Sequence, residues 1–383
     1  MPTNNNVMIY VQHLLGIGHL RRVWFLACAL AERNIEVDLV SGGMPVSGLS
    51  HDKIHLHQLP PVRSLDGKFD RLVDEQDRPI DDNWKDHRRN QLLDLYDALN
   101  PDLLLTETFP FGRRMMRFEL LPLLQKAKES NRSPKVVASI RDILQPKSKP
   151  GRDEEVLKWV KEFYDHILIH GEKAITPLSL TFPFAGKIED KLNYTGYIAD
   201  NKLKISSCDV GENEVIVSGG GGAASLSLLE TAIAAKPLSK LNTQTWRLLV
   251  GHNLDDEIFV ALKQSAGEGI FVERNRPDFA NLLSQCAVSV SQAGYNTVMD
   301  ILQQHCRAVL VPYAESDEVE QSLRANQLDK SGRVVSLSEQ NLSAENLAKA
   351  IDQAATMSLP KKDVNLHGAR RSAELIENWI NER

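Results

Sequence analysis

The stretch HLLGIGHLRRVWFLACAL, residues 13–30, joins a strand to a helix through a glycine-rich turn. The apolar run VMIYVQHL at 7–14 is typical of a buried strand, and apolar residues after the turn recur at helical spacing. IEVDLVSG at 35–42 has the composition of a second strand. A strand–helix–strand unit of this kind begins a doubly wound α/β domain.

The same alternation of strands and helices runs through both halves of the 383-residue chain. A chain of this length usually forms more than one core. We therefore predict an N-terminal domain over 1–172, a connection over 173–205 and a C-terminal domain over 206–362. The further predicted strands are 53–60, 102–108, 135–142 and 166–172 in the first half, and 214–222, 246–251, 269–273, 287–294, 308–314 and 334–337 in the second.

The composition bears on which partners the protein can bind and on where in the cell it acts. A net charge of -6 argues against a nucleic-acid binder that depends on bulk positive charge. The four cysteines form no CxxC pair, which favours free thiols in a reducing cytosol over a disulfide framework or a zinc site. The polar start MPTNNN does not resemble a signal peptide, and no apolar run reaches the ~18 residues of a membrane-spanning helix. We expect a cytoplasmic protein, with a peripheral membrane contact left open.

The turn GIGH at 16–19 places backbone N–H groups at the start of a helix, where they favour an anion. Arg21 occupies the third glycine's place of a GxGxxG turn, and no GKS or GKT follows as in a P-loop. Nicotinamide cofactors and ATP hydrolysis therefore lose support, and we predict no cofactor. His19 could accept a proton near neutral pH, or equally cap the helix.

A second glycine run, SGGGG at 218–222, also follows a strand and precedes a helix. Four consecutive glycines indicate that something approaches the backbone closely. One glycine-rich turn in each half predicts two α/β domains that face one cleft.

Two later motifs add polar groups. In SQAGYNTVMDIL at 291–302, polar residues cluster at a strand end and a helix start, and Asp300 lies one turn further along. A carboxylate there can accept ribose hydroxyls while the helix start holds a pyrophosphate. In EVEQSLRANQL at 318–328, Glu320 and Arg324 share a helix face, which also suits an ordinary surface ion pair.

Two strands of the first half end in charged residues that suit substrate recognition. Glu107 ends one strand and is a reserve candidate for the base. Arg141 ends the next and is a candidate for acceptor binding, although a local ion pair with Asp142 and a helix N-cap are the slightly favoured explanation. Asp81–Asp82 and Asp255–Asp256 lie in loops or at helix starts, so we predict no metal site.

The motifs GIGHLRR, SGGGG, SQAGYNTVMDIL and PYAESDEVEQSLRANQLDKSG occur in an order and spacing that resembles glycosyltransferases of the GT-B fold. The nearest set comprises the peptidoglycan lipid-intermediate N-acetylglucosaminyltransferases, of the family 28 C-terminal type, and related predicted glycosyltransferases. The resemblance covers nearly the whole chain and is most specific over 287–328. It implies two Rossmann-like domains facing a cleft, with the final helix, 363–383, packing back on the first domain.

The resemblance further implies an inverting, metal-independent hexosyl transfer from a nucleotide diphosphate sugar, with UDP favoured. The acceptor is a hydroxyl of a small molecule, glycan or lipid-linked compound that the sequence does not identify. His19 would be the base, and the nucleobase would lie along the loop at 272–279. The donor-binding residues it implies are Gly16, Gly18, Gly219, Gly220, Gly221, Gly222, Arg274, Ser291, Gly294, Asn296, Thr297, Asp300, Gln321 and Arg324.

Several positions depart from the family pattern. The turn is LGIGH rather than GGTGGH, Asp300 stands for a glutamate, and Arg324 stands for an asparagine and adds charge. The GxGH form also resembles the nucleotide-sugar hydrolase of pseudaminic acid synthesis, which shares the fold. A hydrolase, a 2-epimerase or a binding protein without catalysis therefore remain alternatives.

Residues 63–89 interrupt the alternation with mixed charges and few apolar residues. Such a stretch is typical of a solvated loop that leads into an exposed helix. The alternative is a mobile lid or a loop that contacts the acceptor, because long loops in compact domains are often functional.

Overall fold

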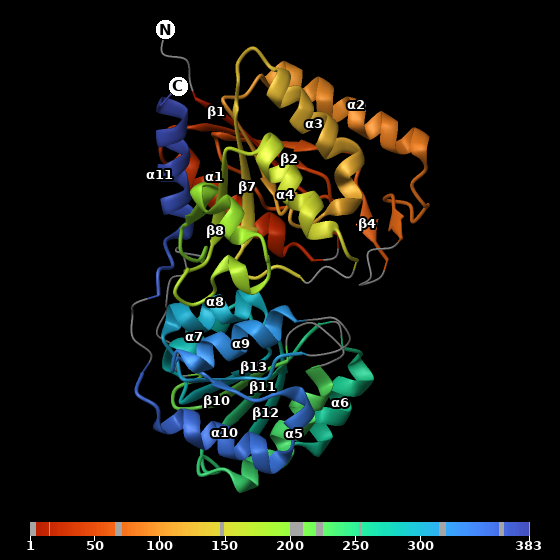
Figure 1. The fold of residues 1–383 in the computed structure, drawn as a ribbon. Helices are drawn as coiled ribbons and strands as arrows, with labels where there is room; N and C mark the ends of the chain where they lie inside the picture. The colour runs from red at the N-terminus through yellow and green to blue at the C-terminus, as the bar shows by residue number, and fades with distance from the viewer. Residues whose placement is uncertain are drawn as a thin grey trace. The chain divides into compact units, whose positions relative to one another are not determined.

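The computed structural model describes residues 5–14, 16–65, 71–145, 149–199, 210–219, 225–252, 254–313, 319–359 and 364–382. The chain divides into two compact units. Unit 1 comprises Met1–Ile198 and His367–Arg383, and unit 2 comprises Ala199–Leu366. Each unit contains a parallel sheet with helices packed against it (Figure 1).

Unit 1 is built on a seven-stranded parallel sheet in the order β3-β2-β1-β6-β7-β8-β9. Its central strands are nearly continuous apolar runs because both faces of the sheet are covered. The strands are β1 (Asn6–Val11), β2 (Glu36–Ser41), β3 (Ile54–Gln58), β6 (Leu103–Glu107), β7 (Lys135–Arg141), β8 (His166–His170) and β9 (Leu192–Tyr194).

Helices cover both faces of this sheet (Figure 1). α1 (Gly18–Ala31) and α11 (Gly368–Asn381) share one apolar cluster, in which Ile376 joins Leu26. Gly368 is required at the start of α11, because a Cβ there would lie 2.4 Å from the Gly196 carbonyl oxygen. The other face carries α2 (Asp82–Leu99), α3 (Arg117–Glu129) and α4 (Arg152–Phe163).

The stretch 173–205 differs from its expected role as a connection. The short 3-10 helices η2 (Leu178–Leu180) and η3 (Ala185–Lys191) lie in it, and β9 extends the sheet of unit 1 by pairing with β8. Elements this short, with prolines between them, develop no helix or strand period in the sequence. Residues 173–198 therefore belong to unit 1 rather than to a connection.

The charged stretch 63–89 also contains structure. A small antiparallel ribbon pairs β4 (Arg63–Ser64) with β5 (Leu72–Val73), and α2 begins at Asp82. Asp81 caps that helix by accepting a hydrogen bond from the Trp84 backbone N–H at 2.7 Å. The remaining short element of unit 1 is η1 (Arg114–Met116).

Unit 2 repeats the architecture with a six-stranded parallel sheet in the order β12-β11-β10-β13-β14-β15. α5, α6 and α10 contribute to the large apolar cluster on one face, and α7 packs with Ile216 and Leu249 in a second cluster. The doubly wound α/β class predicted from the sequence is confirmed. The elements are β10 (Val215–Ser218), α5 (Ser225–Ala235), η4 (Lys236–Leu238), β11 (Trp246–Val250), α6 (Asp256–Ser265), β12 (Ile270–Arg274), α7 (Phe279–Gln285), β13 (Val288–Ser291), α8 (Tyr295–Gln304), β14 (Ala308–Leu310), α9 (Glu320–Lys330), β15 (Val335–Ser336), η5 (Glu339–Asn341) and α10 (Ala344–Thr356).

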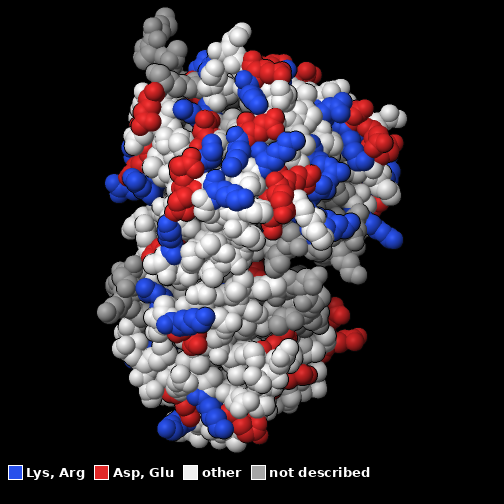
Figure 2. All heavy atoms as spheres, in the orientation of Figure 1, with Lys and Arg blue, Asp and Glu red and all other residues white. Residues whose placement is uncertain are grey.

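Figure 2 shows that basic and acidic side chains are intermixed on the visible face of unit 1. Among the described residues, no helix combines the length and the apolar character needed to cross a bilayer.

Candidate active site

The carboxyl edge of the unit 1 sheet gathers polar side chains. β1, β6, β7 and β8 are neighbours in the sheet, so the residues at their carboxyl ends converge. His19 joins them from the first turn of α1, directly after the glycine turn. The edge therefore brings together residues that the sequence separates by about 150 positions.

His19 is held by its Nδ1 atom. Nδ1 lies 3.2 Å from Glu107 Oε1, 3.2 Å from Thr108 Oγ1 and 3.3 Å from an Arg22 guanidinium nitrogen. The side chain is 14% exposed, so it is nearly buried but not sealed. We infer that Nδ1–H donates to the Glu107 carboxylate, which leaves the Nε2 lone pair as the acceptor.

Glu107 is the centre of this cluster, and its side chain is completely buried. Arg22 forms an ion pair with Oε1, and the Ser139 hydroxyl donates to Oε2 at 2.6 Å. Burial alone would raise the pKa of Glu107. The charge of Arg22 and the hydrogen bonds from His19 and Ser139 outweigh it, so the pKa falls well below its ordinary range.

The burial of Glu107 bears on its place as the reserve candidate for the base. Its carboxylate is fully enclosed and paired with Arg22, so neither oxygen is exposed to a substrate proton in this structure. Its position suits it to orient His19 and to stabilise a positive charge on that ring.

Burial lowers the pKa of His19 to about 3, despite the opposing hydrogen bond to Glu107. The nearby charges of Arg113, Arg22 and Arg141 act in the same direction as burial. His19 is therefore neutral across the physiological pH range, so one ring nitrogen can accept a proton, while burial also makes the ring a weaker base than an ordinary histidine.

Arg113 and Arg141 give the edge a positive character. Arg113 donates to the Gln12 carbonyl at 2.8 Å. Burial and then the charge of Arg141 lower the pKa of Arg113 to about 10, so it still carries a proton at neutral pH. The positive charges of Arg113 and Arg141 repel each other, so binding of an anion between or beside them is favourable.

The cluster continues through residues that the sequence analysis did not select. The Ser139 hydroxyl lies 2.9 Å from His170 Nε2, and His170 Nδ1 lies 3.0 Å from the Thr195 hydroxyl. Burial lowers the pKa of His170 to about 3. A signal for His170 existed, since it ends β8 as Glu107 and Arg141 end their own strands. Arg22 lies one turn after His19 on α1, which was also a usable signal.

Thr108 is another residue that the sequence did not single out. It has a φ of 69°, in the left-handed region that β-branched residues rarely adopt. This conformation turns its hydroxyl toward His19, at 3.2 Å. Gly112 accommodates it, because a Cβ on Gly112 would lie 2.6 Å from Thr108 Cγ2. Strained backbone of this kind is concentrated at functional sites.

The buried histidines predict how stability depends on pH. The folded pKa values of His19 and His170 lie near 3, below the ordinary 6.5, so the unfolded chain binds more protons between these values. Stability is then complete above about pH 7 and falls as the pH decreases. Each histidine should remove about 2 kcal/mol of unfolding free energy at about pH 5. Urea unfolding measured at several pH values tests this expectation.

A His170→Gln variant should lose about half of that pH dependence, and His87→Gln, on the exposed face of α2, should lose none. Unfolding free energies that stay constant from pH 7.5 to pH 5 would contradict the assigned burial of both histidines.

In unit 1, Gly16 and Gly18 form the turn into α1. Gly16 is exposed, and a Cβ on it would meet nothing within 4 Å. Packing within the described residues therefore does not require this glycine. In unit 2, Gly219 is different, because a Cβ there would lie 2.3 Å from the Ser225 Cβ. Gly220, Gly221 and Gly222 lie outside the described residues.

The end of β13 and the start of α8 form a polar corner in unit 2. Ser291 is buried at the strand end, and its hydroxyl has no hydrogen-bond partner among the described residues. Gly294 is the N-cap of α8, where no side chain caps the helix and its first turn holds no acidic residue. Asn296 is exposed on the first turn, and Thr297 and Asp300 are half-buried. The backbone N–H groups of this turn are suited to an anion.

Arg324 makes several contacts within unit 2. Its guanidinium pairs with Glu320 at 2.8 Å, donates to the Ala293 carbonyl at 3.1 Å and lies over the Tyr295 ring. The side chain is buried, and the Glu320 carboxylate compensates its charge. Arg324 braces the loop that precedes α8. Gln321, one residue after Glu320, accepts a hydrogen bond from the backbone N–H of Tyr313, three residues after β14.

The contacts of Arg274 also lie within unit 2. It donates to the carbonyls of Gly251 and Leu254, at 3.0 and 2.8 Å, and forms an ion pair with Asp256. These contacts fix the loop after β11. Among the described residues, no three His, Cys, Asp or Glu side chains are grouped as a metal site.

The glycosyltransferase family 28 C-terminal domain matches residues 215–377. Among solved structures, the calicheamicin glycosyltransferase CalG4 is similar with a TM-score of 0.66 at 13% identity, over 99% of each chain. MurG of Acinetobacter baumannii has a TM-score of 0.63 at 15% identity, over 98% of this chain and 99% of that one. UGT2 of Phytolacca americana, solved with UDP-2fluoro-glucose and pterostilbene, has a TM-score of 0.62 at 14% identity, over 98% and 94%.

Proposed function

We propose, from its GT-B fold and the glycosyltransferase family 28 C-terminal domain over residues 215–377, that this chain transfers a sugar from a nucleotide diphosphate sugar to a hydroxyl. The observation that carries the proposal is the contact of neutral, nearly buried His19 with the Glu107 carboxylate at the glycine turn. UDP is the favoured nucleotide, as in the ligand of the similar UGT2 structure. The acceptor is an unidentified hydroxyl compound.

In the proposed reaction, the Nε2 lone pair of His19 removes the proton of the acceptor hydroxyl. The oxygen then attacks the anomeric carbon while the bond from that carbon to the diphosphate oxygen breaks, which inverts the configuration. Glu107 keeps the ring oriented through Nδ1 and stabilises the imidazolium that forms. Arg22 and Ser139 hold Glu107 in place, so they are positioning residues.

Unit 2 is proposed to hold the donor. The diphosphate lies at the N-terminus of α8, where Gly294 permits close approach and the unpartnered Ser291 hydroxyl is available. Fixed N–H dipoles compensate the charge that develops on the leaving diphosphate, and the proposed transfer needs no metal ion. Asp300 accepts hydrogen bonds from the ribose hydroxyls, as its place one turn into α8 allows.

Direct nucleotide binding tests this donor site. In a thermal-shift and calorimetry panel of nucleoside diphosphates, UDP should stabilise the protein most. Asp300→Ala should weaken UDP binding at least about tenfold, because it removes the hydrogen bonds that the ribose hydroxyls would donate to the charged carboxylate. Glu268→Ala, an exposed carboxylate elsewhere in unit 2, is the matched control and should leave the affinity unchanged. Unchanged UDP affinity in Asp300→Ala would reject the assignment of Asp300.

Incubation with UDP-sugars without an acceptor separates transfer from the other reactions of this fold. Slow turnover alone, and fast turnover after a hydroxyl acceptor is added, supports the transferase. Rapid release of UDP and free sugar without acceptor would identify a hydrolase, and an epimeric UDP-sugar would identify an epimerase.

A further inference from the structure

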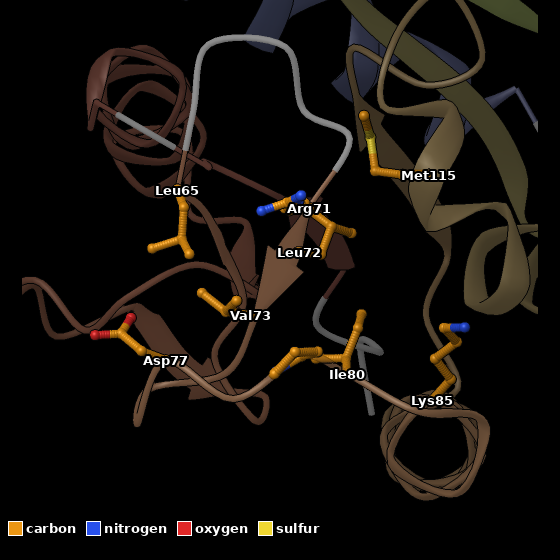
Figure 3. A pocket seen from close by; sticks show the side chains of 9 residues that line it. Leu65, Arg71, Leu72, Val73, Asp77, Ile80, Lys85 and Met115 are labelled. Carbon is orange, nitrogen blue, oxygen red and sulfur yellow. The ribbon is translucent and has the colours of Figure 1, made fainter.

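A pocket of about 620 Å³ opens in unit 1 beside the β4–β5 ribbon. Figure 3 shows Met115 and Lys85 on one side, Leu65 and Asp77 on the other, and Leu72, Val73 and Ile80 between them. Its size falls within the range of small-molecule sites in proteins. The apolar side chains that line it are Leu65, Leu72, Val73, Pro79, Ile80 and Met115.

Hydrogen bonds make the wall of this pocket a defined structure. The Asp74 carboxylate accepts from the backbone N–H groups of Gln76 and Arg78, at 2.9 and 3.0 Å, and from the Arg78 side chain at 2.8 Å. The Ile80 N–H donates to the Leu72 carbonyl and closes the turn. The lining side chains of β5 and of the segment after it are therefore held together before any ligand binds.

The pocket is tied to the strand end that carries the glycine turn. The Ser64 N–H, one residue before Leu65, donates to the Leu14 carbonyl at 3.0 Å. Arg113, two residues before Met115, donates to the Gln12 carbonyl at 2.8 Å. Both walls are thus anchored to the segment between β1 and Gly16, within unit 1.

The charges at the pocket favour an anion. Arg71 is exposed, and it has no carboxylate partner among the described residues. Lys85 also lines the pocket and pairs with Asp82, a fully exposed residue outside the lining. Among the described lining residues, the acidic one is Asp77, which is already paired with Arg63. Within the described lining, the Arg71 guanidinium beside an apolar floor suits a ligand with an apolar body and one negative charge.

We propose that this pocket binds the apolar body of an amphiphilic anion, and that it is the subsite for the non-reacting part of the acceptor. The second half of this proposal rests on the proposed transferase function. The apolar body lies against Leu72, Val73 and Ile80, the anionic group faces Arg71 and Lys85, and the reacting hydroxyl extends toward the glycine turn.

Two fluorescent probes with the same kind of apolar body test the pocket directly. 1-Anilinonaphthalene-8-sulfonate carries one negative charge, and N-phenyl-1-naphthylamine carries none. Leu65→Glu should weaken sulfonate binding at least tenfold, because it places a like charge in the pocket. Leu65 is 53% exposed, so this change should not disturb folding. Leu180→Glu, at a 42% exposed leucine of the same unit, is the matched control and should have no effect.

Arg71→Gln separates the charge from the apolar contacts. It should weaken binding of the sulfonate about fivefold and leave the neutral naphthylamine within twofold of the unsubstituted protein. Arg370→Gln on the exposed face of α11 should change neither affinity. Equal binding of the sulfonate to the unsubstituted protein, Leu65→Glu and Arg71→Gln would overturn the pocket proposal.

Kinetics then test the acceptor role. The sulfonate should inhibit transfer competitively against the acceptor and not against the UDP-sugar. Localised binding without such competition would reject the acceptor role and leave the binding site in place. His19→Ala should bind the sulfonate as the unsubstituted protein does, because His19 is not among the residues that line the pocket. If the unsubstituted protein binds the sulfonate in the pocket but shows no transferase activity, only the proposed function is contradicted.

Discussion

Replacing His19 by alanine should lower kcat for sugar transfer by about 10³-fold, which is the usual contribution of a general base. The nucleotide affinity should stay within twofold, because His19 belongs to unit 1 and the proposed donor residues belong to unit 2. Steady-state kinetics with a UDP-sugar and calorimetry with UDP measure the two quantities. His87→Ala, at an exposed histidine of α2, is the matched control and should keep full turnover.

The pH profile supplies an independent readout of the same assignment. Burial lowers the pKa of His19 to about 3, so the ring stays neutral far below pH 6.5. The value of kcat/KM should therefore stay level from pH 8 to pH 6, where a base with an ordinary histidine pKa would lose more than half of its active form. Full turnover in His19→Ala, with normal UDP binding, would exclude His19 as the base.

Replacing Arg88 by methionine should destabilise the protein by about 3–5 kcal/mol, because it leaves the carboxylate of Glu119 buried without its charge partner. Both side chains are completely buried, and two hydrogen bonds of 2.8 and 2.9 Å join them. Arg88 also donates to the Gly42 carbonyl at 2.9 Å and to the Gln12 side chain at 2.7 Å. The variant thus loosens α2, α3 and the end of β1 together.

Urea unfolding measures this loss, and two further variants control it. Arg89→Met removes the neighbouring, partly exposed arginine and its ion pair with Asp86, and should cost less than about 1 kcal/mol. Arg88→Met combined with Glu119→Leu should recover part of the stability, since an apolar pair needs no charge compensation. Similar unfolding free energies for Arg88→Met and Arg89→Met would refute the role assigned to this buried pair.

The sequence predicted those parts of the fold that depend on local pattern. Apolar runs marked the strands of both sheets because parallel strands are buried on two faces. The glycine turn before α1 marked the place of His19, and the position of Glu107 at a strand end marked it as a polar residue of the ligand-binding edge. The strands β4, β5 and β9 were not predicted, because they lie in stretches where charged residues or prolines interrupt any apolar pattern.

Only the tertiary structure decided how deeply these polar residues are buried and which charges they pair with. His19 and Glu107 are 88 positions apart, and only the adjacency of β1 and β6 brings them within 3.2 Å. The same packing buries the Glu107 carboxylate beside Arg22, which suits it to the orienting role that we propose. Arg274 and Arg324 carry charges that a linear sequence assigns to a ligand, yet each is bound by carbonyl and carboxylate groups of unit 2. Residue type and spacing are local properties, whereas burial and charge partners depend on contacts between distant segments, and these contacts set which groups can react.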